Sequence, residues 1–248
     1  MYGYGYRYNS GLVIGAGGGA PFANTKSLLF DGLDDYVDCG VISTLQSATQ
    51  YSLSAWFKTT NNTKNQGIIK WYASGSQWIE ISYVGSLMYF IPVGLGAYGT
   101  NSTALSNNVW YNVTMVFNGA LTGNANRLKA YLNGVELPLT YNGTVPSITT
   151  SMPNSTFRIG QRYIASDHFL GNIDEASVFD YALTSAEVLA IGGTIPTDLS
   201  LLATPPTNWY RNGDNDTYPT ITDVGSAASN NGTMTNMTSG SIVSDVPL

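Results

Sequence analysis

The sequence predicts an all-β protein, a two-sheet antiparallel sandwich of the jelly-roll type. Segments between residues 24 and 193 alternate apolar and polar side chains with a period of two, which is typical of half-buried strands. Turn signals rich in Gly and Asn separate these segments, and only one clear helical pattern occurs. Many short strands with one short helix indicate an antiparallel sandwich or jelly roll.

The strands follow from the alternation in chain order. Residues 51–58 place four apolar side chains on one face, namely Tyr51, Leu53, Ala55 and Phe57. Asn133-Gly134 separates two alternating runs and predicts a type I′ hairpin, because that turn needs positive φ at both central residues. Further strands are expected at 66–70, 77–84, 87–93, 112–117, 128–132, 135–137 and 156–160.

One helix of about two turns is expected after residue 184. Thr184 and Glu187 have the spacing of a capping box, in which each side chain accepts a hydrogen bond from a free backbone amide of the first turn. Gly192-Gly193 ends the segment.

Composition divides the 248 residues into three segments and excludes several classes of protein. We expect a Gly/Tyr-rich arm at 1–23, the jelly-roll domain at 24–193, and a Pro/Thr/Asn-rich extension at 194–248 whose prolines disfavour a central sheet position. The arm lacks the pattern of a signal peptide, so we expect it to persist in the mature protein. A net charge of −6 without a basic cluster argues against nucleic acid, and no apolar run suits insertion into a membrane. Cys39 is the only cysteine and is expected to be a buried thiol.

Five motifs in order resemble the laminin-G-like domains of the concanavalin A-like jelly-roll superfamily. They lie at 27–38, 51–57, 110–117, 128–134 and 171–183. The resemblance implies that the first and last strands of the jelly roll pair and close a sheet. A weaker resemblance, to structural proteins of bacteriophages and marine viruses, comes from the residue pattern of the C-terminal extension at 208–214 and 218–236.

Acidic residues of two motifs predict a structural calcium site. Clustered carboxylates repel one another unless a cation neutralises them, and Ca²⁺ prefers six to eight oxygen ligands. If the two motifs pair, the candidate ligands are Asp31, Asp34, Asp35 and Asp174. The alternative is that Asp31 and Asp34 cap a turn and that Asp174 bonds loop amides.

Aromatic residues beside a Ser/Gly loop are candidates for sugar binding, because sugar rings stack on Trp and Tyr. These candidates are Trp71, Tyr72 and Trp78. A Trp in a two-sheet fold is more often part of the core, and this alternative stays open.

No catalytic set is apparent. None of the four Glu residues has the paired spacing of a retaining glycosidase, and His168, the only His, lies in a segment expected to be a surface loop. We therefore expect no enzyme activity.

The leading expectation is a virion structural protein, a capsid decoration or fibre component located at the virion surface. Its expected partners are other virion proteins or copies of itself in an oligomer, with cell-surface glycans as ligands. The alternative is a bacterial secreted or cell-surface carbohydrate-binding module, and a weaker one is a divergent glycoside hydrolase using Glu80 or Glu175.

Overall fold

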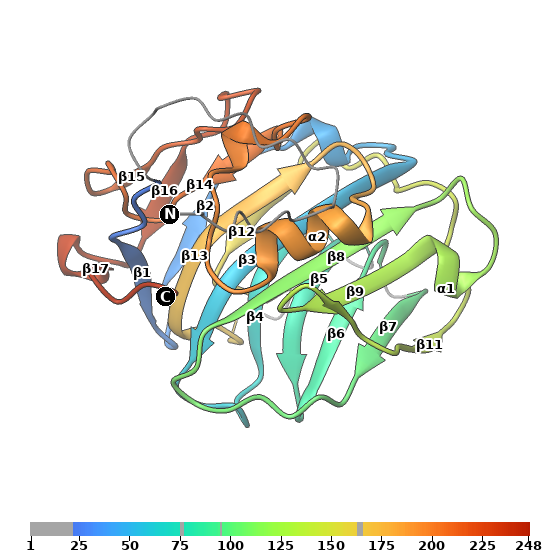
Figure 1. Cartoon of the computed structure of the whole chain (residues 1–248), viewed down its shortest axis with the longest axis horizontal. Coiled ribbons are helices and arrows are strands. Elements are labelled where there is room, and N and C mark those ends of the chain that lie inside the picture. Colours follow the sequence, from blue (N-terminus) through green and yellow to red (C-terminus); the bar gives the residue numbers. More distant parts are fainter. Residues whose placement is uncertain (1–21, 75–76, 95, 163–165) are drawn as a thin grey trace, which may run out of the picture.

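Two antiparallel sheets form the protein, as expected from the sequence (Figure 1). The structure, a computed structural model, describes residues 22–74, 77–94, 96–162 and 166–248. Sheet A has the order β10-β9-β8-β3-β13-β1-β17, with β14 also paired to β13, and sheet B has the order β11-β7-β6-β5-β4-β12-β2-β16-β15.

The strands of sheet A are β1 (Ser27–Asp31), β3 (Gln50–Thr59), β8 (Tyr111–Asn118), β9 (Leu128–Leu132), β10 (Val135–Glu136), β13 (Leu170–Phe179), β14 (Asn208–Tyr210) and β17 (Ile242–Val243). Those of sheet B are β2 (Tyr36–Asp38), β4 (Gln66–Ser74), β5 (Gln77–Val84), β6 (Leu87–Ile91), β7 (Tyr98–Asn101), β11 (Thr140–Asn142), β12 (Thr156–Ile159), β15 (Thr220–Ile221) and β16 (Gly232–Thr235). The helices are α1 (Asn124–Arg127) and α2 (Ser185–Gly192), with 3₁₀ turns at Ser43–Leu45, Leu199–Leu201 and Ser239–Ser241.

The core lies between the sheets and follows the predicted alternation. The four apolar side chains of β3 that the sequence placed on one face all lie in it, fully or almost fully buried: Tyr51, Leu53, Ala55 and Phe57. Asn133 and Gly134 have positive φ between β9 and β10, which confirms the predicted hairpin turn. Cys39 is buried with a free thiol, as expected.

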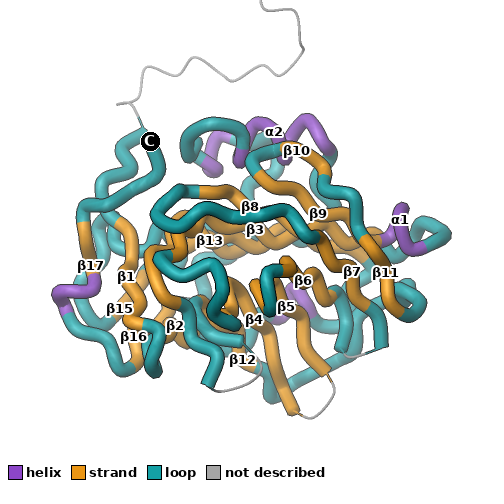
Figure 2. The backbone as a smooth tube through the Cα atoms, turned by 90° about the horizontal axis from the view of Figure 1, so that it is seen from below, coloured by secondary structure: helices purple, strands orange, loops and turns teal. Residues whose placement is uncertain are grey.

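The outer face of sheet A is covered by α2 and the chain that follows it (Figure 2). Thr184 and Glu187 form the predicted capping box at the start of α2. Val188 and Ile191 of this helix pack on Phe179 of β13 in a second apolar cluster outside the main core. The protein therefore has three layers, with α2 outside sheet A and sheet B beyond the core.

The C-terminal segment contributes to both sheets. β14 pairs with β13 and β17 pairs with β1 in sheet A, whereas β16 pairs with β2 in sheet B. Of the four strands of this segment, β14, β15 and β17 lie at the periphery of a sheet, as the prolines suggested, but β16 lies between β2 and β15. Strands on both sides of the boundary predicted at 193/194 therefore belong to the same sheets. Within residues 24–193, β1, β2 and β13 have free positions for pairing, and strands of the C-terminal segment occupy them. Of the predicted arm at 1–23, only Phe22 and Ala23 lie within the described residues.

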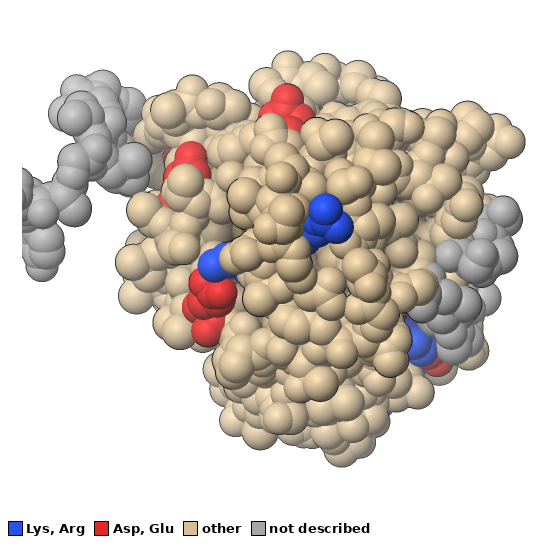
Figure 3. All heavy atoms as spheres, turned by 90° about the vertical axis from the view of Figure 1, so that its right-hand side faces the viewer, with Lys and Arg blue, Asp and Glu red and all other residues tan. Residues whose placement is uncertain are grey.

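The surface carries few charges. Figure 3 shows that the face at the α1 end is mostly uncharged and carries only a few separate Lys, Arg, Asp and Glu groups, in agreement with the 10% of charged residues in the sequence. No helix in the described part of the chain is long and apolar enough to span a bilayer.

Candidate functional site

Three of the four predicted calcium ligands meet in the turn after β1. The carboxylates of Asp31, Asp34 and Asp35 offer oxygen atoms that lie within 4.8 Å of one another. Asp35 accepts a hydrogen bond from the backbone amide of Asp31 at 3.0 Å, and Asp31 accepts one from the amide of Leu33 at 2.7 Å. Burial raises the pKa of Asp35, and repulsion by the other two carboxylates adds to the rise. Their oxygens suit a hard cation, although three carboxylates alone fall short of the six ligands that Ca²⁺ takes.

Asp174 does not join this cluster. Strands β1 and β13 pair as predicted, but the antiparallel register places Asp31 opposite Leu170. Asp174 lies four residues further along β13, which is roughly 13 Å in an extended strand. It accepts a hydrogen bond from Asn24 at 2.9 Å at the other end of β1. The expectation of one site with all four acids is therefore wrong, because pairing of the strands does not bring both acidic ends together.

The two tryptophans predicted to bind sugar are buried. Trp71 belongs to the main core, and Trp78 is 1% exposed on the neighbouring strand β5. Tyr72 is half-buried, with the Nζ of Lys70 4.9 Å from the centre of its ring. These three residues therefore do not form an exposed aromatic platform, because alternation along β4 turns the Trp71 side chain into the core.

The outer face of sheet B carries a buried network of charged and polar groups. Lys70 donates hydrogen bonds to the Gln161 side chain and to the Arg162 carbonyl, both at 3.0 Å, and burial lowers the pKa of Lys70 to about 8. Glu80, fully buried, forms an ion pair with Arg162 at 3.1 Å. His168 is also buried, with Nδ1 3.1 Å from the Asp35 carbonyl, so the expected surface loop is wrong at this residue. Gln161 and Arg162 thus lie against this face of the sheet.

A second acidic group lies on the outer side of sheet A, at a bulge in β13. The pairing of β13 with β3 shifts after Asp174, and Glu175 has a φ of 50°. Its carboxylate accepts hydrogen bonds from Trp209 Nε1 at 2.5 Å and from Arg211 Nε at 3.2 Å. Burial raises the pKa of Glu175 to about 7, against the opposing effect of Arg211 and Trp209. Burial and the neighbouring Glu175 also raise the pKa of Asp174. The bulge turns Glu175 toward β14, and its two oxygens orient Trp209 and Arg211.

An open groove of about 360 Å³ lies directly beside these residues, and we call it the Trp209 groove. Its volume is at the lower end of the range typical of small-molecule sites. Phe22 stacks on Trp209 with ring centroids 6.1 Å apart, and the Arg211 guanidinium lies 4.3 Å from the centre of the Phe22 ring. The groove is lined by Phe22, Asp198, Ser200, Trp209, Arg211, Asp214, Asn215, Thr222 and Val224.

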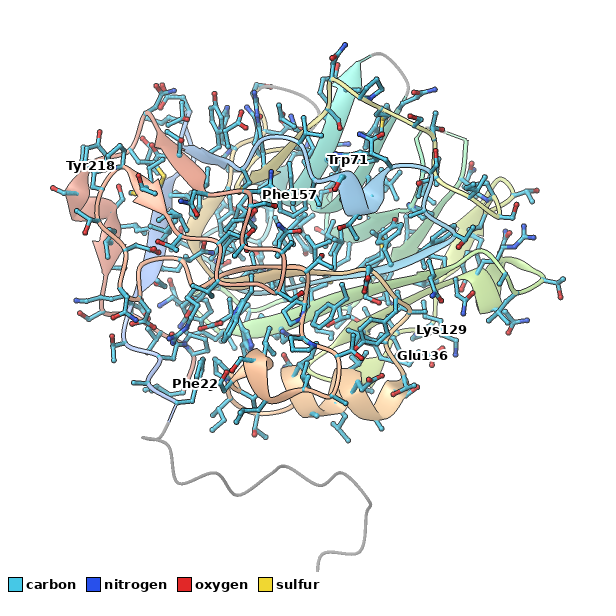
Figure 4. The ribbon with its side chains drawn as sticks, turned by 90° about the horizontal axis from the view of Figure 1, so that it is seen from above. Phe22, Trp71, Lys129, Glu136, Phe157 and Tyr218 are labelled. Carbon is cyan, nitrogen blue, oxygen red and sulfur yellow. The ribbon has the colours of Figure 1, made fainter. Side chains whose placement is uncertain are left out.

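The Trp209 groove combines aromatic and polar groups from segments far apart in the chain. Phe22 precedes β1, Asp198 and Ser200 lie between α2 and β14, and the remaining residues lie in and after β14. Asp214 holds the segments together, because it accepts hydrogen bonds from the backbone and hydroxyl of Thr25 and from Arg211. Figure 4 shows Phe22 on the opposite side of the molecule from Trp71, so this groove is separate from the predicted aromatic site.

This groove was not among the sites predicted from the sequence. The segment Asn208-Trp-Tyr-Arg-Asn-Gly-Asp214 was singled out for its resemblance to viral proteins. It supplies three of the lining residues. Its contact with Phe22 could not be read from the sequence, because 186 positions separate Phe22 from Asn208 and no strand pattern links them.

One family model matches more than half of the chain. A family model described as the Concanavalin A-like lectin/glucanases superfamily matches residues 30–189. No curated protein matches the sequence.

Solved structures share the fold at low sequence identity. A structure described as a putative carbohydrate binding protein from Bacteroides ovatus is 16% identical with a TM-score of 0.62, and the match covers 88% of this chain and 60% of that one. The CBM40 domain of the Ruminococcus gnavus IT-sialidase, bound to α2,3-sialyllactose, is 12% identical with a TM-score of 0.52, covering 67% of this chain and 96% of that one. A second structure of this CBM40 domain is 11% identical with a TM-score of 0.51, covering 69% of this chain and 100% of that one. The chain thus spans about 60% of the Bacteroides ovatus protein.

Proposed function

The chain belongs to the concanavalin A-like lectin/glucanases superfamily, and from this premise we propose that it is a non-enzymatic carbohydrate-binding domain whose sugar site is the Trp209 groove. The observation that carries the proposal is one open groove in which the half-buried Phe22 ring, stacked on the buried Trp209, lies beside carboxylate, amide and hydroxyl side chains. Aromatic rings pack against the C–H faces of sugars, while polar side chains bond the hydroxyl groups. The names of similarly folded proteins, which describe carbohydrate binding, support the same class of ligand.

The geometry gives no support to the glycoside hydrolase alternative. Glu80 lies on the outer face of sheet B and Glu175 on the outer side of sheet A, so the core separates them. Glycosidase carboxylates lie about 5 to 9.5 Å apart across one substrate. Glu175 also uses both of its oxygens to hold Trp209 and Arg211.

A glycan array followed by titration calorimetry tests the site. Thr222 is exposed and lines the Trp209 groove, so Thr222→Trp should fill the groove and weaken binding of the best array ligand at least tenfold. Thr220→Trp is the matched control, because Thr220 is also exposed, lies two residues away and is not part of the groove.

Two results would contradict the proposal. One is wild-type protein that binds no glycan, and the other is Thr222→Trp protein that binds as tightly as wild type. If Tyr72→Ala instead abolished binding, the sugar site would lie on the outer face of sheet B.

We further propose that the domain is displayed on a virion as a decoration or fibre component, in contact with other virion proteins or with copies of itself. A surface with few charges suits contacts with other proteins. The resemblance of residues 208–214 and 218–236 to viral structural proteins also supports this proposal. Copurification with intact particles and antibody labelling would test it. If the antibody labelled only free protein, the result would favour the alternative of a bacterial secreted or cell-surface module. A hydrolase gene beside the gene for this protein would favour the same alternative.

Calcium at Asp31, Asp34 and Asp35 is a separate proposal. Among the described residues, none of these carboxylates forms an ion pair with a Lys or Arg side chain, and repulsion by Asp31 and Asp34 helps to raise the pKa of Asp35. We expect millimolar Ca²⁺ to raise the melting temperature and a chelator to lower it, because a ligand of the folded state stabilises that state. Asp34→Asn should reduce this effect, and an unchanged melting temperature in both conditions would exclude it.

A further inference from the structure

The Trp209 groove has an excess of negative charge. Asp198 and Asp214 line it, and Arg211 is the only cation among its nine described lining residues. An anionic ligand would therefore meet more carboxylates than cations.

Arg211 is already committed to other groups. Its Nε donates to Glu175 at 3.2 Å, and Nη2 donates to Asp214 at 3.0 Å and to the Ala23 carbonyl at 2.5 Å. The plane of the guanidinium is also covered by Phe22. A sugar carboxylate could bind the Nε–Nη2 edge of Arg211 only by displacing one of these three acceptors.

Asp198 presents an acceptor to the groove. Its Oδ1 accepts hydrogen bonds from the backbone amide of Ser200 at 3.0 Å and from the Ser200 hydroxyl at 2.6 Å, which orient the side chain. None of the hydrogen bonds described for the chain uses Oδ2 of Asp198. A carboxylate oxygen held in this way accepts strongly from a sugar hydroxyl and repels an anion.

We infer that the Trp209 groove selects uncharged sugars against acidic ones, and that Asp198 is the residue that determines this specificity. The inference rests on the proposed sugar-binding function. It differs from what a sialic-acid ligand, such as that named for the CBM40 domain of similar fold, would require.

Paired glycans test the inference. The full chain is titrated with neutral oligosaccharides and with the same oligosaccharides carrying a sialic acid, a uronic acid or a sulfate, for example lactose and 3′-sialyllactose, at low and high salt. We expect each neutral member to bind at least about fivefold more tightly at low salt, and the ratio to shrink as salt screens the repulsion.

Asp198→Asn keeps the shape and the Oδ1 acceptor but removes the charge. It should move the ratio between neutral and acidic glycans toward one. Glu136→Gln is the charge-matched control, because Figure 4 shows Glu136 at the other end of the molecule from Phe22, and it should leave the ratio unchanged.

The outcomes separate this inference from the proposed function. Acidic glycans that bind as tightly as their neutral partners, or an Asp198→Asn ratio equal to that of wild type, would overturn the selectivity while leaving sugar binding intact. Absence of binding by every member of the panel would overturn both.

Discussion

Glu175 shows how one buried carboxyl group organises the site. The β-bulge gives it a positive φ and turns its carboxylate toward β14, where it holds the Trp209 indole and the Arg211 guanidinium. A buried carboxylate that accepts two such hydrogen bonds is satisfied, so its part in the groove is to position these two side chains. The sequence shows Asp174 and Glu175 as two adjacent acidic residues. The alternation of polar and apolar residues did not predict the bulge, which gives the two carboxyl groups different partners.

The raised pKa of Glu175 predicts a pH dependence of stability. Burial raises that pKa to about 7 in the folded state, from 4.5. Between these two values the folded state binds more protons at this group than the unfolded chain does, so the free energy of unfolding falls as pH rises through this window. Glu175→Gln removes the titrating group. The loss of unfolding free energy between pH 4.5 and pH 8 should therefore be smaller than in the wild type by about 1 to 3 kcal/mol, since each pKa unit corresponds to about 1.4 kcal/mol.

Urea unfolding at pH 4.5 and pH 8 measures this change. Glu136→Gln is the control, because Glu136 is exposed on β10 and should leave the pH dependence as it is. If Glu175→Gln showed the same pH dependence as wild type, Glu175 would be ionised throughout the range.

At the scale of elements, α2 is held by its first turn and by apolar packing. Thr184 accepts a hydrogen bond from the Glu187 amide at 3.3 Å, and Glu187 accepts from the Thr184 amide at 2.7 Å. Thr184→Ala should therefore lower the free energy of unfolding by about 1 kcal/mol. Chemical denaturation measures it, with Thr194→Ala as an exposed control that should have little effect. A loss as small as that of the control would show that packing alone holds α2.

Elements with local signals could be predicted, and contacts between distant elements could not. The capping box of α2, the Asn133-Gly134 turn and the core face of β3 each depend on residues close in sequence, and the structure confirms all three. The predicted four-acid site was wrong because it depended on the register between β1 and β13. The predicted aromatic platform was wrong because strand alternation buries Trp71, and the groove depends on contacts between Phe22 and the C-terminal segment.

At the scale of the whole molecule, the C-terminal segment unites the two sheets. It supplies strands to both, and Thr25 and Asp214 join it to the start of β1 through short hydrogen bonds. A chain ending at residue 206 would leave the edges of β1 and β2 and the flank of β13 unpaired. We expect that shortened chain to unfold at lower urea concentration and with a smaller m-value than the full chain.

The same experiment tests the boundary predicted at 193/194. Unfolding of the shortened chain with the midpoint and m-value of the full chain would show that residues 24–193 form an independent domain, to which the C-terminal strands add little.

The most direct test of the sugar site is a ¹H–¹⁵N NMR titration that follows the indole N–H signals of the five tryptophans. Addition of the best neutral glycan should shift the Trp209 signal, whose N–H is bonded to Glu175 beside the groove, and leave those of the core residue Trp71 and of Trp78 unchanged. Saturable shifts at Trp71 or Trp78 with no change at Trp209 would contradict the account.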